Sequence, residues 1–228
     1  MFESKYSKVL TVILVIVIIG ILGLLGFLAY DYYQKYVTTN DAENFVNSYE
    51  KDAGIDNNED NKNDEEENNQ NNELPDINTG TNASSNNNQS SQAAKPQYKG
   101  FGVLGTMEIP KISLKYPILE KMTKSSIETS IAFLWGAGVN QPGNTVIVGH
   151  NYRNGAFFSN NKKLNIGDKI YITDNNSKRL IYTIYNKFET TDTDTSFYQR
   201  DTSGKAEVTL STCTDSGKQR LIILARED

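Results

Sequence analysis

The sequence predicts a mainly β domain at the C-terminal end of a membrane-anchored chain. Residues 100–228 contain short runs rich in Val, Ile, Tyr and Thr, separated by turn residues, which is typical of strands in a sandwich or barrel. Residues 9–30 are uncharged and, apart from Thr11, apolar, and the segment between these two regions is rich in Asn and acidic residues. The C-terminal region, of about 130 residues, is long enough to bury one core and fold alone.

Composition excludes several classes of function. The 228-residue chain has 23 basic and 28 acidic side chains and a net charge of −5, so we expect no nucleic-acid partner. Its single cysteine excludes an intrachain disulfide framework and a Cys-rich zinc module. Its single histidine excludes the usual multi-histidine metal sites.

Residues 9–30 are predicted to form a single transmembrane helix. At about 1.5 Å per residue, a helix of this length spans a hydrocarbon core of about 30 Å. The run exceeds the apolar region of a signal peptide and lacks an Ala-x-Ala-like cleavage site, so we expect it to be retained. Lys5 and Lys8 precede it, which puts residues 1–8 in the cytoplasm and everything after Tyr30 outside the cell.

Residues 31–99 are predicted to be an extracellular disordered linker. Residues 57–72 are almost wholly Asn, Asp, Glu and Lys, and residues 83–94 are Ser, Asn, Gln and Ala, so little apolar surface is available to offset the entropy of ordering. The region from 41 to 76 holds 13 acids and 2 bases, whereas residues 100–228 hold 16 bases and 13 acids. We interpret the acidic block as a solvated spacer, with cation binding as the alternative. The aromatic residues between 31 and 49 indicate a short helix at its start.

In the C-terminal domain, strand-like runs outnumber helical ones. Asn, Gly, Asp and Pro clusters supply the turns between them. Two segments, 125–133 and 157–164, are predicted to be helical, with Ser125 or Ser126 as the cap of the first. The seven predicted strands are 102–109, 114–118, 145–149, 169–173, 179–188, 207–213 and 220–225.

Cys213 ends one of these strands. Alternation puts Val208 and Leu210 on the core face and Cys213 on the other, with hydroxyl neighbours, so the thiol is expected to point into a groove or solvent. A buried structural thiol is the commoner fate of a free cysteine. Outside the cell, however, an idle exposed thiol is a liability, so position alone leaves a reactive and a structural role open.

His150 and Arg220 are the groups that could act with Cys213. His150 leaves a strand and opens a polar loop, the kind of place where sites are built, although a lone histidine is more often structural. Arg220 lies seven residues after Cys213, across a short turn that predicts an antiparallel hairpin. The guanidinium would then lie close to the cysteine and could donate two hydrogen bonds to a carbonyl oxygen; the alternative is an ordinary exposed arginine.

Taken together, these residues resemble the sortase family of Gram-positive cell-surface transpeptidases. The TLSTC string at 209–213 is the most specific match, and the GH pair at 149–150 lies upstream of it as in the family. The similarity runs through nearly all of residues 100–228, over GTMEIPKI at 105–112, YPI at 116–118, GNTVIVGH at 143–150, FF at 157–158, GDKIY at 167–171, TLSTC and RL at 220–221.

The resemblance implies a closed eight-stranded β-barrel with short helices, residues 100–228 being the catalytic domain. It implies a cysteine transpeptidase that cleaves a sorting signal resembling Leu-Pro-any-Thr-Gly between Thr and Gly and transfers the protein to an amine. Cys213 would be the nucleophile, His150 the acid and base, and Arg220 the group that holds the carbonyl oxygen. The implied partners are surface proteins that bear the signal, an amine of peptidoglycan or a pilin, and the membrane.

Two short segments bear on the sortase class and on a cofactor. The Ser within TLSTC is similar to class B enzymes, but residues 188–207 are too few for the long helix of that class, and the Asp-Pro-aromatic lid motif of class C is absent upstream of residue 100. We therefore expect a class B-like or class D-like enzyme. Some members bind calcium before the cysteine strand, where this chain has Asp192, Asp194 and Asp201. Because acids are common in solvated loops, we expect no cofactor, with calcium as the alternative.

Two rival functions remain. A papain-type cysteine peptidase usually has its cysteine early, at a helix N-terminus, whereas Cys213 follows His150 and ends a strand. A tethered extracellular binding domain without catalysis is the second rival, and the intact set of Cys213, His150 and Arg220 argues against it.

Overall fold

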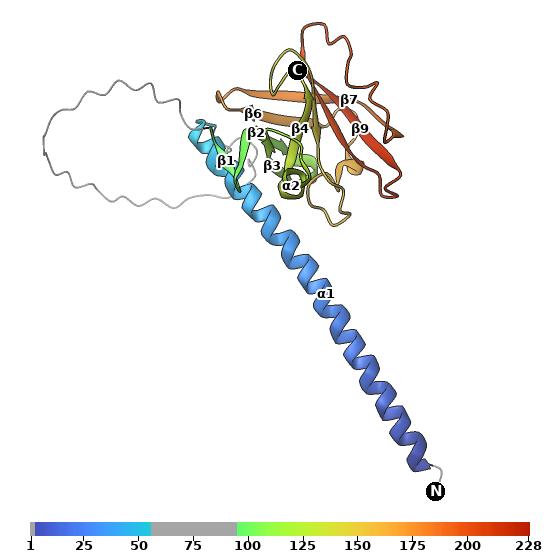
Figure 1. Cartoon of the computed structure of the whole chain (residues 1–228). Helices are drawn as coiled ribbons and strands as arrows, with labels where there is room; N and C mark the ends of the chain where they lie inside the picture. Colours follow the sequence, from blue (N-terminus) through green and yellow to red (C-terminus); the bar gives the residue numbers. More distant parts are fainter. Residues whose placement is uncertain (1–2, 56–94) are drawn as a thin grey trace, which may run out of the picture.

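The computed structural model describes residues 3–55 and 95–228 (Figure 1). One long helix, α1 (Glu3–Asp52), runs from the N-terminus to a β-barrel formed by the C-terminal part of the chain. Within the described ranges, α1 is the helix long and apolar enough to cross a membrane, and its most apolar window is wholly exposed. Most of the predicted linker, residues 56–94, lies outside the described residues.

Eight strands close the barrel, which confirms the predicted fold class. Around the barrel the order is β2-β3-β4-β5-β8-β9-β7-β6, and an antiparallel pairing of β6 with β2 closes the circle. The two-residue strand β1 (Gln97–Tyr98) adds to β2, so the ordered domain begins a few residues before the predicted boundary at residue 100. The strands are β2 (Phe101–Ile109), β3 (Leu114–Leu119), β4 (Ile131–Gly136), β5 (Gly143–Val148), β6 (Lys169–Asp174), β7 (Arg179–Thr191), β8 (Ala206–Cys213) and β9 (Gln219–Glu227).

Closure of the barrel depends on a glycine in β2. Gly105 lies where the β2–β3 register shifts, and it also pairs with Asp174 of β6. A Cβ atom at Gly105 would stand 2.2 Å from the carbonyl oxygen of Thr173. Any larger residue would therefore force β2 and β6 apart at the seam.

Both predicted helices of the domain were too long. Helix α2 (Lys124–Thr129) starts from a capping box between Thr123 and Ser126, so its cap is Thr123 and not Ser125 or Ser126 as predicted. It ends at Thr129, four residues before the predicted end at residue 133. It stops because Ser130 is extended and donates its hydroxyl to the carbonyl of Pro117, at 2.6 Å. The apolar run that follows is the missed strand β4, whose Ile131 is fully buried beside β3. The segment 157–164 contains only a 3₁₀ turn, η2 (Asn161–Lys163); another, η1 (Pro110–Ile112), joins β2 to β3.

The strands of the barrel carry apolar side chains on both faces. The inner cluster includes Val208, Leu210 and Ile223, all essentially buried. On the outer face, a second set (hereafter the outer cluster) lies under the segment 192–205 that joins β7 to β8, and it consists of Val146, Phe197, Ile222 and Leu224. This covering segment makes the outer face of β5, β8 and β9 a second packed layer.

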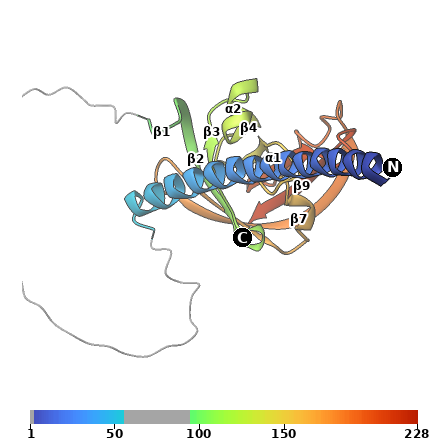
Figure 2. The same cartoon turned by 90° about the horizontal axis from the view of Figure 1, so that it is seen from below.

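The helix predicted at the start of the linker is present and continues to Asp52, which confirms that prediction and corrects the assignment of residues 31–52 to a disordered linker. Figures 1 and 2 show α1 as one continuous helix whose C-terminal end lies along the barrel beside β2 and β3. Ala42 and Val46 are fully buried there, and Phe45 packs on Tyr98 with ring centroids 5.1 Å apart. Burial against the barrel supplies the stability that an isolated helix of this composition would lack.

A buried ion cluster fixes the end of α1 to the barrel. The guanidinium of Arg179 in β7 lies 2.6 Å from a carboxylate oxygen of Glu50 in α1 and 2.6 Å from one of Glu108 in β2. Lys115 in β3 also pairs with Glu108, at 2.7 Å. Burial raises the pKa of Glu108, but the hydrogen bonds and charges of Lys115 and Arg179 outweigh it and hold that pKa below its ordinary value.

Candidate active site

The site lies where β5, β8 and β9 end side by side. β8 is parallel to β5, with Val148 opposite Ser211, and antiparallel to β9, with Cys213 opposite Arg220. The short turn between Cys213 and Arg220 therefore forms the hairpin that the sequence predicted. The three predicted residues are brought to one end of the barrel by three neighbouring strands.

Cys213 is half-buried on the outer face of β8. Val208 and Leu210 face the inner cluster as predicted. The opposite face is less open than expected, because Thr209 is fully buried and Ser211 nearly so. The alternation of β8 therefore leaves its last residue, Cys213, as the partly accessible one on that face.

Arg220 contacts the sulfur directly. Its Nη1 donates to Sγ of Cys213 at 2.7 Å, across the directly opposed pair of the β8–β9 ladder. Adjacent strands hold opposed side chains on the same face, so the register itself fixes this contact. A guanidinium in this position can also donate to an oxygen bound next to the sulfur.

His150 is held at the neighbouring strand end. Gly149 donates its N–H to the carbonyl of Ser211 at 3.3 Å, and Thr212 Oγ1 donates to the carbonyl of Gly149 at 2.7 Å. Extending the β5–β8 register by two residues from Val148 and Ser211 puts His150 opposite Cys213. Gly149 also leaves room for its neighbours, because a Cβ there would lie 2.9 Å from Ile131 Cγ2 and 3.0 Å from the ring of Phe158.

The imidazole of His150 packs against an aromatic ring. It lies 4.8 Å from the ring centroid of Tyr152, whereas the hydrogen bond of Cys213 Sγ goes to Arg220. Burial lowers the pKa of His150, and the charge of Glu128 in α2 opposes that effect. The neutral form of the imidazole is thus favoured near pH 7, which suits a group that must accept a proton.

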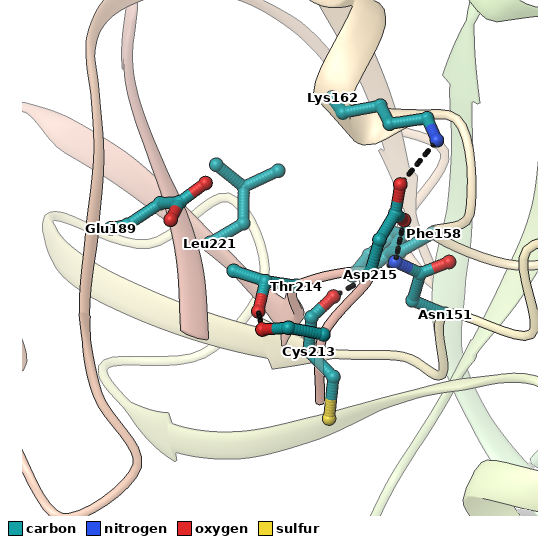
Figure 3. A pocket seen from close by; sticks show the side chains of 9 residues that line it. Asn151, Phe158, Lys162, Glu189, Cys213, Thr214, Asp215 and Leu221 are labelled. Carbon is teal, nitrogen blue, oxygen red and sulfur yellow. Dashed lines mark hydrogen bonds and ion pairs between the residues drawn. The ribbon is translucent and has the colours of Figure 1, made fainter. Parts of the chain in front are cut away.

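Asn151 is a site residue that the sequence analysis missed. Its Nδ2 donates to the carbonyl of Cys213 at 2.9 Å and to Oδ1 of Asp215 at 3.0 Å, and Asp215 pairs with Lys162 at 2.6 Å. These contacts tie the β8–β9 hairpin to the segment that carries His150. Its position directly after His150 was the available signal. Figure 3 shows Asp215 between Lys162 and Asn151, with Sγ of Cys213 pointing away from them.

Two hollows lie on the surface of the barrel domain. One, of about 250 Å³, is lined by Cys213 together with Lys162, Glu189 and Asp215 among others, and in Figure 3 the sulfur of Cys213 points away from Lys162 and Asp215. The other, of about 440 Å³, lies on the segment 192–205 and is lined by Trp135 and Tyr198 with neighbouring polar residues. Tyr198 belongs to the segment that covers the outer cluster, so the second hollow lies on the outer face of the barrel.

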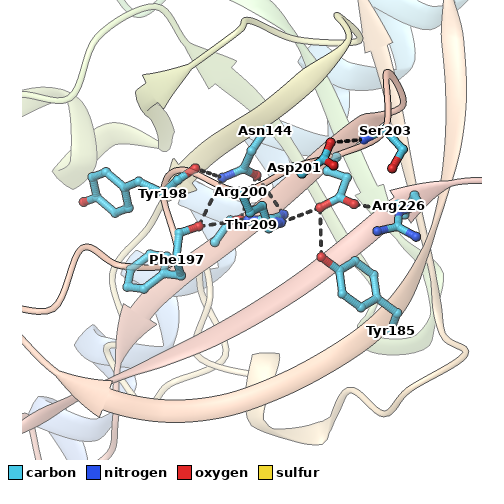
Figure 4. A network of polar contacts seen from close by, with 10 residues as sticks. Asn144, Tyr185, Phe197, Tyr198, Arg200, Asp201, Ser203, Thr209 and Arg226 are labelled. Atoms are coloured by element: carbon cyan, nitrogen blue, oxygen red, sulfur yellow. Dashed lines mark hydrogen bonds and ion pairs between the residues drawn. The ribbon is translucent and has the colours of Figure 1, made fainter.

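A buried polar network holds the segment 192–205 in place. Asn144 Nδ2 donates to the carbonyl of Tyr198 at 2.8 Å, and its Oδ1 accepts from Arg200 Nη2 at 3.0 Å and from Thr209 Oγ1 at 2.8 Å (Figure 4). Arg200 also pairs with Glu207, whose other oxygen accepts from Arg226 at 2.6 Å. The network fixes the backbone that carries Phe197 and Tyr198, and thus the wall of the second hollow.

The three acids considered for calcium lie in the same segment. Asp194 accepts from Thr190 Oγ1 at 2.5 Å and from the N–H of Ser196 at 2.8 Å, and Asp201 accepts from the N–H of Ser203 at 2.8 Å. Asp192 is exposed. In the described part of the chain, no three His, Cys, Asp or Glu side chains cluster in a way that could hold a metal ion.

Comparison with known proteins identifies the family. The sequence model of the Sortase domain matches residues 107–228, more than half of the chain. The chain belongs to the sortase family. The match covers the barrel from β2 to the C-terminus and therefore all three predicted site residues.

Three sortases illustrate the likeness. Sortase A of Bacillus anthracis is 32% identical over 124 residues, which are 53% of this chain and 58% of that protein. The Clostridium perfringens Sortase D5 transpeptidase is 31% identical with a TM-score of 0.51, over 56% of this chain and 79% of that one. Sortase A from Corynebacterium diphtheriae is 26% identical with a TM-score of 0.52, over 56% and 61%. The chain thus spans less than two thirds of the Bacillus relative.

The segment before the cysteine strand bears on the sortase class. Residues 192–205, all of which the structure describes, contain turns and no α-helix. The sequence analysis expected this segment to be too short for the long helix of class B. That expectation is confirmed for these residues.

Proposed function

We propose that this sortase is a cysteine transpeptidase whose site is Cys213, His150 and Arg220. The observation that carries the proposal is the 2.7 Å contact of Arg220 Nη1 with Cys213 Sγ, at a strand end whose register puts His150 on the adjacent strand. A guanidinium beside a half-buried sulfur suits acyl transfer, because the same guanidinium can donate hydrogen bonds to the substrate carbonyl oxygen as that oxygen gains negative charge.

In the first half-reaction, Sγ of Cys213 attacks the carbonyl carbon of the scissile peptide bond after giving its proton to His150. The carbonyl oxygen gains negative charge and accepts hydrogen bonds from Arg220. The C–N bond then breaks, and His150 returns the proton to the leaving amine. The product is a thioester between Cys213 and the new C-terminus of the substrate.

In the second half-reaction, an amine replaces the departed one. Its nitrogen attacks the thioester carbon, His150 accepts the proton that the nitrogen loses, and Arg220 again holds the oxygen. The C–S bond breaks, Cys213 recovers its proton, and a new amide bond remains. A neutral His150, which its burial favours, is the form needed to receive this proton.

We propose a sorting signal resembling Leu-Pro-any-Thr-Gly as the substrate, cleaved between Thr and Gly, with an amine of peptidoglycan or a pilin as acceptor. The hollow on the outer face, whose wall carries Trp135 and Tyr198 with ring centroids 5.7 Å apart, offers aromatic contacts to an extended peptide. Family membership supports the substrate class.

We also propose that residues 9–30 anchor the chain in the cell membrane, with residues 1–8 in the cytoplasm and the barrel outside. Residues 100–228 are then an extracellular catalytic domain. Lys35 Nζ lies 2.8 Å from where a Cβ of Gly155 would stand, so the loop after His150 contacts α1. Lys35 is only five residues beyond Tyr30, or about 8 Å of helix. The site would therefore face the membrane surface, where anchored surface proteins emerge.

The test uses the full chain in detergent with a panel of Leu-Pro-any-Thr-Gly peptides and hydroxylamine as the acceptor. We expect a peptide hydroxamate from the wild type and none from Cys213→Ala. Arg220→Lys, which keeps the charge but loses the fork, should lower kcat about 10²-fold or more. Hydrolysis that ignores added hydroxylamine would instead indicate a peptidase, and no reaction across the panel would indicate a binding domain.

A further inference from the structure

The loop that carries His150 is folded back on itself. The carbonyl of His150 accepts from the N–H of Phe158 at 3.0 Å, and Asn151 bridges to Phe157. Phe157 is buried, and its φ of +49° is in the left-handed region that a side chain rarely adopts. Such a conformation persists only when the surroundings hold it.

A line of aromatic rings connects this loop to β3. The ring of His150 lies 4.8 Å from that of Tyr152, Tyr152 lies 5.7 Å from Phe157, and Phe157 lies 5.2 Å from Tyr116. Tyr116 belongs to β3 and is 2% exposed. The ring of Tyr116 is therefore held in the barrel, and the loop packs against it through Phe157.

The hydroxyl of Tyr116 holds both the loop and α1. It accepts from the buried N–H of Phe157 at 3.2 Å, and it lies 3.3 Å from Oγ1 of Thr39 in α1. Because Phe157 uses an acceptor lone pair, the hydroxyl proton is free to be donated to Thr39. One side chain thus joins the juxtamembrane helix to the strained residue of the loop.

α1 meets the same loop a second time. A Cβ at Gly155, whose φ is +94°, would lie 2.8 Å from Lys35 Nζ, one helical turn before Thr39. Both contacts lie on the face of α1 that continues into the buried positions Ala42 and Val46. The loop is therefore packed between the barrel and α1.

We propose that Tyr116 is a positioning residue for His150, bridging α1 and the loop so that docking of α1 sets the surroundings of the imidazole. The proposal rests on the function given above only in the role of His150. Removing the Tyr116 hydroxyl leaves the buried N–H of Phe157 without this acceptor, and the loop can relieve it by moving outward. Tyr152 would move with it and expose the imidazole to water.

The charged and titratable groups around the imidazole give the expected direction. Glu128 of α2 acts on His150 through its charge, Tyr152 stacks on it, and Cys213 with Arg220 lies on the adjacent strand. Loss of the Tyr116 hydroxyl acts on His150 through exposure of the imidazole to water. Hydration favours the imidazolium, so the pKa of His150 should rise toward the ordinary value of about 6.5.

The experiment is a ¹⁵N-histidine NMR titration of the full chain in detergent, in which His150, the single histidine, gives the only side-chain signal. We expect Tyr116→Phe to raise the pKa of His150 and Thr39→Val to raise it by less. The pH at which kcat/KM rises should move up with it, and kcat should fall roughly 10-fold while KM is kept.

Tyr182→Phe is the matched control. Tyr182 is equally buried and loses one hydrogen bond, to Asn140, away from the loop of His150. An unmoved His150 titration in Tyr116→Phe, or an equal shift in Tyr182→Phe, overturns the proposal, and an unmoved titration in Thr39→Val overturns the part assigned to α1. If the wild type shows no transpeptidation but the titration moves as expected, the positioning role stands and the proposed function fails.

Discussion

Removal of Arg179 tests whether α1 is held by the buried ion cluster. Arg179→Met keeps most of the side-chain volume and removes the guanidinium that lies 2.6 Å from both Glu50 and Glu108. The carboxylates are almost wholly buried, with side-chain exposures of 1% and 8%. Each then loses a cation while it stays in a low-dielectric environment.

The magnitude follows from what each carboxylate retains. Breaking a buried ion pair by removing one partner costs about 3–5 kcal/mol. Glu108 keeps Lys115 at 2.7 Å, and Glu50 keeps the hydroxyl of Thr106 at 3.3 Å, so we expect the lower end, about 3 kcal/mol. For a domain of this size that is a fall in Tm of about 10 °C.

Fluorescence of Trp135 is the assay, because this single tryptophan of the chain lies in the barrel and reports its unfolding. Arg226→Met is the matched control. Arg226 also pairs with a buried carboxylate, Glu207, but its side chain is 46% exposed and Glu207 keeps Arg200. We expect about 1 kcal/mol or less there. If Arg179→Met costs no more than Arg226→Met, the cluster does not hold α1 and the reasoning is wrong.

Three further predictions concern the outer face, acid and calcium. Asn144→Ala removes the donor to Tyr198 and the acceptor for Arg200 and Thr209, so urea unfolding should show a loss of about 2–3 kcal/mol, with a raised KM as the wall of the hollow loosens. Burial raises the pKa of Glu108 and of Glu207, but their cationic partners outweigh it and hold each pKa below its ordinary value. Their stabilisation is therefore present above about pH 4.3 and lost as pH falls through the folded values, so Tm should be flat near neutral pH and drop below about pH 4. Asp194 and Asp201 already accept hydrogen bonds within their own segment, so calcium at about 5 mM should leave Tm and turnover as in EDTA; a rise in Tm would show a calcium site.

The barrel was predictable from sequence because its strands carry local signals. Seven strands were placed near their observed positions, and the short turn after Cys213 sufficed to predict the hairpin that brings Arg220 to the sulfur. β4 was missed because its apolar run begins just after helix α2 ends, and the predicted helix 125–133 was extended into it. Periodicity cannot separate a buried strand from a buried helix over so few residues. Only its partners in β3 and β5 make it a strand.

The docking of α1 was not predictable for a different reason. Its buried positions Ala42, Val46 and Glu50 recur every four residues, as on a helix face. Glu50 carries a carboxylate, however, and a carboxylate in a sequence predicts an exposed position. Glu50 can be buried because Arg179 meets it, 129 residues away in the chain. Asn151 was missed on similar grounds, since its partners lie in the distant hairpin after Cys213.

The docked helix changes what the acidic segment can do. A flexible linker between the membrane and the barrel would let the site sample a wide range of heights. Here residues 56–94 follow Glu50 in the sequence, and Glu50 is bound to Arg179 of the barrel. The length of residues 56–94 therefore cannot set the distance from Tyr30 to the domain. That distance is set by helix, at about 18 Å for the twelve residues from Tyr30 to Ala42. With the anchor proposed for residues 9–30, the barrel is held at one height above the membrane with His150 toward the bilayer. Lengthening or shortening residues 56–94 should therefore leave the turnover of a membrane-anchored substrate unchanged. Inserting residues between Tyr30 and Lys35 should reduce that turnover.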